Sequence, residues 1–196
     1  MGMDNTSYKK AVAFHGHSCP GLAMGYRAAK YALSKFGKAG DEEVFAVVEN
    51  DSCAVDAVQA LCSCTFGKGN LQFLDRGKQV FTFFHRKSGK GVRIYVAAPE
   101  LPARDKLFQE KLSAAIKPTA ADKLALRALR ERRIKAILSA PDKTVLKISA
   151  PRVKLPPPAK IRNSGYCSAC GERTMSTRLA RRAGALLCVE CSERKR

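Results

Sequence analysis

Tryptophan is absent from the sequence, and histidine occurs only three times. Aromatic side chains make up 7% of the 196 residues, so few are available to stack on nucleotide bases. No apolar run approaches the about 20 residues that a membrane-spanning helix needs, and the N-terminus lacks the charged and then apolar layout of a secretory signal. These absences predict a soluble, cytoplasmic protein with no membrane partner.

Acidic side chains are scarce relative to basic ones. The 17 aspartates and glutamates stand against 36 lysines and arginines, which gives a net charge of +19. The excess is +4 over residues 1–103, +7 over 104–150 and +8 over 151–196. A basic surface attracts nucleic acid or anionic proteins, but without a motif that reads bases it shows electrostatic attraction alone. Nucleic acid therefore stays one candidate partner.

The eight cysteines form two groups along the chain. In a cytoplasmic protein they indicate metal or redox chemistry rather than a disulfide framework. The first group lies in the first third of the chain and the second in the last thirty residues or so: Cys19, Cys53, Cys62 and Cys64, then Cys167, Cys170, Cys188 and Cys191. We expect two separate sites.

Residues 14–21, Phe-His-Gly-His-Ser-Cys-Pro-Gly, bring two imidazoles and a thiol together. Pro20 suits the first turn of a helix, and the apolar spacing that follows predicts a helix to Phe36 that ends at Gly37. Cys19 is then expected at the helix N-terminus, where free backbone N–H groups favour the thiolate.

His17 and Cys19 are the functional candidates in this stretch. Histidine and thiolate are the commonest soft metal ligands, and a thiolate is also a nucleophile. The alternative is that Cys19 is a small buried residue and that the histidines hydrogen-bond a turn. For His15 the structural interpretation is the preferred one.

A second candidate region follows the continuous β-prone run at residues 44–48, which predicts a buried strand. The helix predicted over residues 54–61 places Cys53, Asp56 and Gln59 along one stripe. An acid and an amide on the face of a cysteine favour a site. The alternative is that Asp56 only complements the helix dipole.

A glycine-rich turn follows that helix and contains Cys64 and Lys68. It is not a nucleotide-binding loop of the Walker type, since Gly69 stands where serine or threonine would follow the lysine. Two glycines around a lysine present backbone N–H groups and a positive charge to an anion, although an ordinary turn explains the pattern equally well.

The remaining pattern predicts an α+β fold with a mixed β-sheet core flanked by helices. Strand-like segments at residues 71–74, 80–85 and 92–98 are interpreted as an antiparallel meander. Helices are expected over 102–116 and 120–138, and one last strand over 145–148. Residues 151–165, with three prolines in succession, predict an extended linker between a core domain at 1–150 and a small domain at 166–196.

The small domain carries the strongest chemical signal in the chain. Two C-x-x-C pairs, Cys167/Cys170 and Cys188/Cys191, are separated by 17 residues, a spacing typical of zinc bound by four thiolates. Four thiolates leave no open position, so we expect a structural Zn²⁺ site. An iron centre and a redox dithiol pair are the alternatives. Arginines surround the pairs, which suits nucleic acid or offsets the negative charge of the site: Arg173, Arg178, Arg181 and Arg182.

Three segments together resemble the FmdE family of formylmethanofuran dehydrogenase proteins. They are residues 14–21, Asp56-Ala57-Val58-Gln59, and residues 64–71, Cys-Thr-Phe-Gly-Lys-Gly-Asn-Leu. The C-x-x-C pairs are similar to the zinc finger of many members, and more loosely to the DksA/TraR type. The resemblance implies an α+β core, a linked zinc finger, a homodimer, and association with molybdenum or tungsten formylmethanofuran dehydrogenase in the one-carbon metabolism of anaerobes, as in methanogenesis.

The resemblance also implies a set of site residues in the core. Carried over by position, they are His17, Cys19, Cys53, Asp56, Gln59, Cys64, Lys68 and Asn70. We expect His17, Cys53 and Cys64 to share one ion, with Cys19 as fourth ligand or reactive thiol, Asp56 and Gln59 behind them, and Lys68 and Asn70 as anion contacts. Cys62 stands where the resemblance implies another residue.

Three functional hypotheses follow from the sequence. The first is an accessory protein with a metal or thiol redox site in the core and a zinc finger for assembly. The second is a nucleic-acid-binding regulator that uses the basic finger, and the third is a standalone thiol- or metal-dependent enzyme. Nothing in the sequence resembles the ligands of a pterin cofactor, so oxidation of formylmethanofuran by this chain alone is not expected.

Overall fold

The computed structural model describes residues 5–37, 43–114 and 117–194 of the chain. The chain divides into two compact units, Met1–Pro157 and Pro158–Arg196. The first unit has the predicted α+β class, a mixed sheet flanked by helices, and the second is a small cysteine-rich domain.

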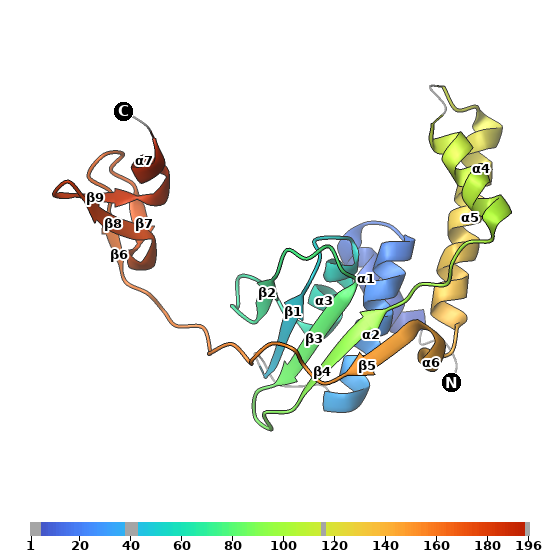
Figure 1. Ribbon diagram of the computed structural model, residues 1–196, viewed down its shortest axis with the longest axis horizontal. Helices are drawn as coiled ribbons and strands as arrows, with labels where there is room; N and C mark the ends of the chain where they lie inside the picture. The colour runs from blue at the N-terminus through green and yellow to red at the C-terminus, as the bar shows by residue number, and fades with distance from the viewer. Residues whose placement is uncertain (1–4, 38–42, 115–116, 195–196) are drawn as a thin grey trace. The chain divides into compact units, whose positions relative to one another are not determined.

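A five-stranded sheet forms the centre of the first unit (Figure 1). Its strands are β1 (Val44–Val48), β2 (Leu71–Phe73), β3 (Val80–His85), β4 (Gly91–Val96) and β5 (Leu146–Ser149), in the order β2-β1-β3-β4-β5. β1 is buried along its whole length, as its continuous apolar run predicts.

The predicted antiparallel meander is wrong for its first strand. β2 pairs in parallel with β1, with Ala46 opposite Leu71, and β1 lies between β2 and β3. β3 and β4 do form the antiparallel hairpin. The reason is the helix α3 (Ala54–Cys62) between β1 and β2, because a helical crossover returns the chain in the same direction as the strand before it.

Helices pack on one face of this sheet. α2 (Pro20–Phe36) begins at Pro20 and ends with Gly37 in a left-handed conformation, which confirms the predicted bounds. α2 and α3 approach so closely that a Cβ on Gly25 would lie 1.9 Å from the carbonyl oxygen of Ala54. The glycine therefore lets the backbones of the two helices touch.

Helix α1 (Asn5–His15) is a helix that the sequence pattern did not predict. It packs on α2 and α3 through a small cluster that includes Ala11, Leu22 and Ala57. Because α1 ends at His15, the histidine-rich stretch is the connection between α1 and α2. This connection is the position of the candidate site.

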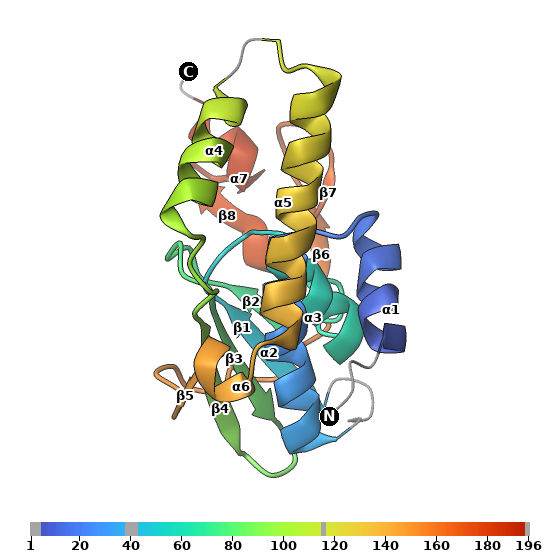
Figure 2. The same ribbon diagram turned by 90° about the vertical axis from the view of Figure 1, so that its right-hand side faces the viewer.

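Two further helices, α4 (Ala103–Ser113) and α5 (Ala120–Ser139), run side by side (Figure 2). The predicted end of α4, Ile116, lies outside the described residues. The C-terminal half of α5 packs on α2, with Ile134 and Ile137 against Ala23. The buried Arg27 holds the end of α5 by donating to the carbonyls of Ile137, Leu138 and Ala140 and by pairing with Asp142 of the short helix α6 (Asp142–Val145).

Residues 151–157 lie on the sheet and contain no helix or strand. Val153 and Leu155 pack against Phe45, Val47 and Phe84 on the face opposite the helices. The Arg86 guanidinium donates to the carbonyls of Pro156 and Pro157 at 2.9 and 3.4 Å. The first half of the predicted linker is therefore a strap that belongs to the core.

The second unit consists of short elements. They are β6 (Ser164–Tyr166), β7 (Arg173–Met175), the 3-10 turn η1 (Ser176–Arg178), β8 (Leu179–Arg182), β9 (Ala185–Cys188) and α7 (Val189–Glu193). β6 pairs with β7, and β8 with β9, both antiparallel. In neither unit is a described helix long and apolar enough to cross a bilayer.

Candidate functional site

The connection between α1 and α2 is built by a glycine and a helix cap. Gly16 has φ +89°, and its N–H donates to the Val12 carbonyl, which turns the chain sharply after His15. Cys19 is the N-cap of α2, and its Sγ accepts a hydrogen bond from the Leu22 N–H at 3.3 Å. The predicted position of Cys19 at the helix N-terminus is confirmed.

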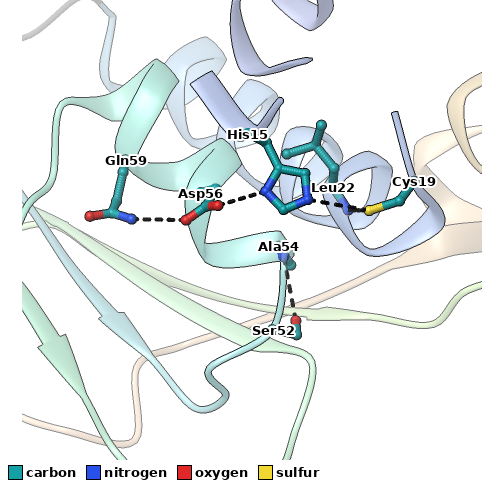
Figure 3. A network of polar contacts seen from close by, with 7 residues as sticks. All are labelled: His15, Cys19, Leu22, Ser52, Ala54, Asp56 and Gln59. Atoms are coloured by element: carbon teal, nitrogen blue, oxygen red, sulfur yellow. Dashed lines mark hydrogen bonds and ion pairs between the residues drawn. The ribbon is translucent and has the colours of Figure 1, made fainter. Parts of the chain in front are cut away.

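A chain of polar contacts runs from Cys19 across to α3 (Figure 3). His15 Nε2 lies 3.8 Å from Cys19 Sγ, and His15 Nδ1 lies 2.7 Å from an Asp56 carboxylate oxygen. The Gln59 amide donates to the other oxygen of Asp56 at 3.1 Å. An acceptor beside Nδ1 keeps the proton there, so Nε2 presents its lone pair toward the sulfur.

His15, His17 and Cys19 bring their donor atoms within 4.8 Å of one another. The two imidazole rings have centroids 4.5 Å apart. A tetrahedral zinc with Zn–N about 2.05 Å and Zn–S about 2.3 Å separates a nitrogen from a sulfur ligand by about 3.6 Å. The 3.8 Å between His15 Nε2 and Cys19 Sγ is close to that value, so the geometry suits a shared ion.

His15 is the member of this group that the sequence reasoning treated as structural. Its side chain is 11% exposed and is oriented by the Asp56 carboxylate, so it occupies a central position in the contact chain. The signal that would have identified it is Gly16. A glycine directly after a histidine marks a helix end, and such an end would have placed His15 across from Cys19.

Cys53 lies beside Cys19. A Cβ added to Gly21 would lie 3.2 Å from Cys53 Cβ and 3.9 Å from Cys19 Sγ, so this glycine leaves room for both cysteines. Both side chains are half-buried free thiols. Burial and the neighbouring Cys19 thiol raise the pKa of Cys53, which keeps it protonated in the absence of a metal or oxidant.

The structure does not bring Cys64 to the imidazoles. Cys64 is fully buried in the main hydrophobic cluster, and its thiol contacts the carbonyls of Val44 and Cys62 at 3.4 and 3.5 Å. Burial raises the pKa of Cys64 to about 12 and raises that of Cys62 as well. The environment of Cys64 is that of an inert core thiol rather than an exposed ligand.

Asn70 holds the glycine-rich turn together. Its side-chain oxygen accepts from the Thr65 N–H, and its amide donates to the carbonyls of Val44 and Ser63. The Lys68 N–H donates to the Thr65 hydroxyl. The amide of Asn70 is thus engaged by the backbone, and an anion contact at Lys68 stays a prediction.

The second donor cluster is the set of four cysteines in the small unit. The sulfurs of Cys167, Cys170, Cys188 and Cys191 lie within 4.8 Å of one another, and Cys170 and Cys188 are 4.0 Å apart. A tetrahedral zinc separates its sulfurs by about 3.8 Å. Backbone N–H groups point at the sulfurs, and those of Cys170, Cys188 and Ala169 lower the pKa of Cys167 to about 6.

Two family profiles match the chain. The profile described as "FmdE, Molybdenum formylmethanofuran dehydrogenase operon" covers residues 14–147. The profile of the prokaryotic DksA/TraR C4-type zinc finger covers residues 162–196, which include the four clustered cysteines.

Two known proteins resemble the chain. A probable S-adenosyl-L-methionine-binding protein of Archaeoglobus fulgidus is 42% identical over 95 residues, which are 45% of this chain and 26% of that protein. The chain thus spans about a quarter of the relative's length. The crystal structure of an FmdE-like protein of tungsten formylmethanofuran dehydrogenase from Syntrophus aciditrophicus superposes with a TM-score of 0.60 at 23% identity, over 94% of this chain and 89% of that one.

Proposed function

The chain belongs to the FmdE family, and on that premise we propose that it is an FmdE-type accessory protein whose core binds a divalent transition-metal ion. The ligands are His15, His17 and Cys19. The observation that carries the proposal is the convergence of these three donors within 4.8 Å at the end of α1 and the start of α2.

The donor set fits such an ion. Two imidazoles and one thiolate suit zinc and its first-row neighbours, and the N-terminus of α2 favours the thiolate form of Cys19. Three protein ligands leave a coordination position open, where a bound ion acts as a Lewis acid on water or substrate. The donors lie at the surface of the core, where His17 is exposed, so an outside molecule has access to them.

Asp56 and Gln59 have a positioning role in this proposal. The Asp56 carboxylate holds His15 in the tautomer and orientation that frees Nε2, and Gln59 holds the carboxylate. Both residues were expected behind the ligands. The ligand set itself differs from the expected one, since His15 takes the place assigned to Cys64.

In the small unit we propose one Zn²⁺ held by the four clustered cysteines. Four thiolates at these distances fill a tetrahedral site, and the match to a C4-type zinc finger supports zinc. The finger then serves assembly, either with a second copy of the chain or with the proteins of a molybdenum or tungsten formylmethanofuran dehydrogenase. The family supports this choice of partner.

The test is metal content of the full-length chain purified under reducing conditions. We expect two ions per chain. His17→Ala and Cys19→Ala are each expected to leave one ion, and Cys167→Ser combined with Cys170→Ser is expected to leave the other. A wild-type chain that retains a single ion, unchanged by His17→Ala, would refute the core site.

A thiol redox pair is the second candidate, and the closeness of Cys19 and Cys53 favours it. Cys53→Ser separates the two functions, because a redox pair needs both sulfurs whereas the proposed ion does not use Cys53. Under the metal hypothesis this variant keeps two ions. Loss of the core ion in Cys53→Ser would show that Cys53 belongs to the ligand set.

A further inference from the structure

A groove of about 530 Å³ opens beside the donor cluster. One wall is α5, and the other includes Ser18, which stands between the two exposed ends of the cluster, His17 and Cys19. Neither the metal ligands nor the finger account for this groove.

One face of α5 forms the wall. Arg127, Arg130, Ile134 and Leu138 line the groove, and so do Glu131 and Lys135. These positions are separated by three or four residues, which places them in a single stripe along the helix. The stripe alternates charged side chains with apolar ones, so the groove has both a cationic rim and an apolar floor.

The rim has more positive charge than the protein neutralises. Arg127 pairs with Glu131 at 3.0 Å. Within the described residues no ion pair engages Arg130 or Lys135, both of which are exposed. Two cations without an acidic neighbour attract a ligand that carries negative charge.

The floor gives the ligand an apolar part as well. Ile134 is 8% exposed and packs with Leu138 and Tyr8 in the cluster that joins α5 to α2. The Tyr8 hydroxyl and the Ser18 hydroxyl are 2.8 Å apart and close the end of the groove near the donor cluster. Figure 2 shows α5 running along the core in front of α2.

We propose that this groove binds a small organic anion, a phosphate ester or a carboxylate. Arg130 and Lys135 hold its charged end, Ile134 and Leu138 contact its apolar part, and Ser18 directs it toward the donor cluster. This inference rests on the proposed function where it makes that molecule the substrate or ligand of the core ion. The binding of the anion itself does not depend on the ion.

A small molecule fits the groove better than nucleic acid does. None of the residues that line the groove is aromatic, so it offers no platform for base stacking. The cations occupy a short stretch of one helix rather than a track for a phosphate backbone. The groove volume is also in the range of small-molecule sites.

The experiment measures binding by methyl NMR of Ile134 and Leu138 in the full-length chain. The probes are butyl phosphate, pentanoate and, as a cationic counterpart of equal size, butylammonium. We expect both anions to shift the methyl signals with saturation, and butylammonium to leave them unchanged. The stronger of the two anions identifies the charged group.

The variant Arg130→Gln combined with Lys135→Gln is expected to weaken anion binding by about tenfold, since it removes two charge-assisted contacts. The matched control is Lys123→Gln combined with Lys143→Gln, which removes the same charge from positions outside the groove. Equal affinity in the wild type and the groove variant would overturn the proposal. So would binding of a single-stranded oligonucleotide without binding of either small anion.

A last arm separates this proposal from the metal site. In His17→Ala the core ion is expected to be lost and the anion still to bind. A chain that binds its core ion but neither anion would refute the groove alone. A chain that binds the anions but has no core ion would refute the proposed function and leave the groove standing.

Discussion

The two donor clusters of this chain stand in opposite relation to the structure around them. In the small unit the described buried residues are Cys167 and Cys188, two of the four cysteines themselves. In the large unit the donors lie at the rim of a sheet-and-helix core whose buried side chains include Phe81, Phe83 and Ile94. His17, one of its donors, is exposed.

The difference teaches what each cluster contributes. A unit whose buried residues are its ligands has little apolar surface to remove from water, so the free energy of binding an ion is also its free energy of folding. A cluster on the rim of a packed core inherits its geometry from helices that fold without it. The first cluster is therefore suited to structure, and the second to chemistry with an outside molecule.

The largest expected effect comes from removing the ion of the finger. Cys167→Ala is expected to unfold residues 164–194, because structural zinc supplies on the order of 10 kcal/mol of folding free energy in such modules. Amide NMR of the full-length chain should show collapsed signals for the finger and unchanged signals for the core.

The control is Thr177→Ala, an exposed position in the same unit, which should leave the finger signals in place. A dispersed finger spectrum in Cys167→Ala would mean that the small unit has a core of its own. The comparison between the two clusters would then fail.

The second effect concerns the packing that positions the core cluster. Gly25→Ala places a methyl group 1.9 Å from a backbone oxygen of α3, so α2 and α3 must separate. We expect a loss of about 3 kcal/mol in the free energy of unfolding of the core, measured with denaturant. Gly67→Ala, where a Cβ would meet nothing within 4 Å, should change it by less than about 0.5 kcal/mol.

The third effect separates geometry from stability. Asp56→Ala removes the acceptor that orients His15 and is expected to weaken the core ion by about 10- to 100-fold, with the finger ion unaffected. A metal titration monitored with a competing chelator measures this. Asp51→Ala removes the same charge from an exposed position, and equal losses in both variants would show a general electrostatic effect instead.

The smallest effect concerns the boundary between the two units. Arg86→Gln removes the donors to the Pro156 and Pro157 carbonyls and the cation over the Phe45 ring, at a cost of about 1 kcal/mol for a partly exposed group. Limited proteolysis should then cut residues 151–157 faster than in the exposed control Lys90→Gln. An unchanged cleavage rate would indicate that Val153 and Leu155 alone hold the strap.

Sequence reasoning predicted the elements whose signals are local. The bounds of α2 follow from Pro20 and Gly37, the buried strand β1 from its apolar run, and the cysteine cluster of the finger from its spacing. In each case the residues that cause the structure lie within one turn, strand or knuckle. Chemistry at that range depends on few alternatives.

What sequence reasoning missed depends on contacts between distant residues. The parallel pairing of β1 with β2 is decided by where α3 returns the chain, which a strand of three residues does not encode. Cys64 and Cys19 are the same residue type, and only their surroundings separate a buried core thiol from a helix cap. His15 required a helix before it that the pattern did not reveal.

The strap has a consequence for how the two units work together. Because residues 151–157 are fixed to the sheet, the connection that remains free before β6 is residues 158–163, which can span no more than about 20 Å. A tether that short gives each unit a high effective concentration near the other, in the millimolar range for short linkers. A partner that touches both would gain avidity from that concentration, and release of the strap would dilute it.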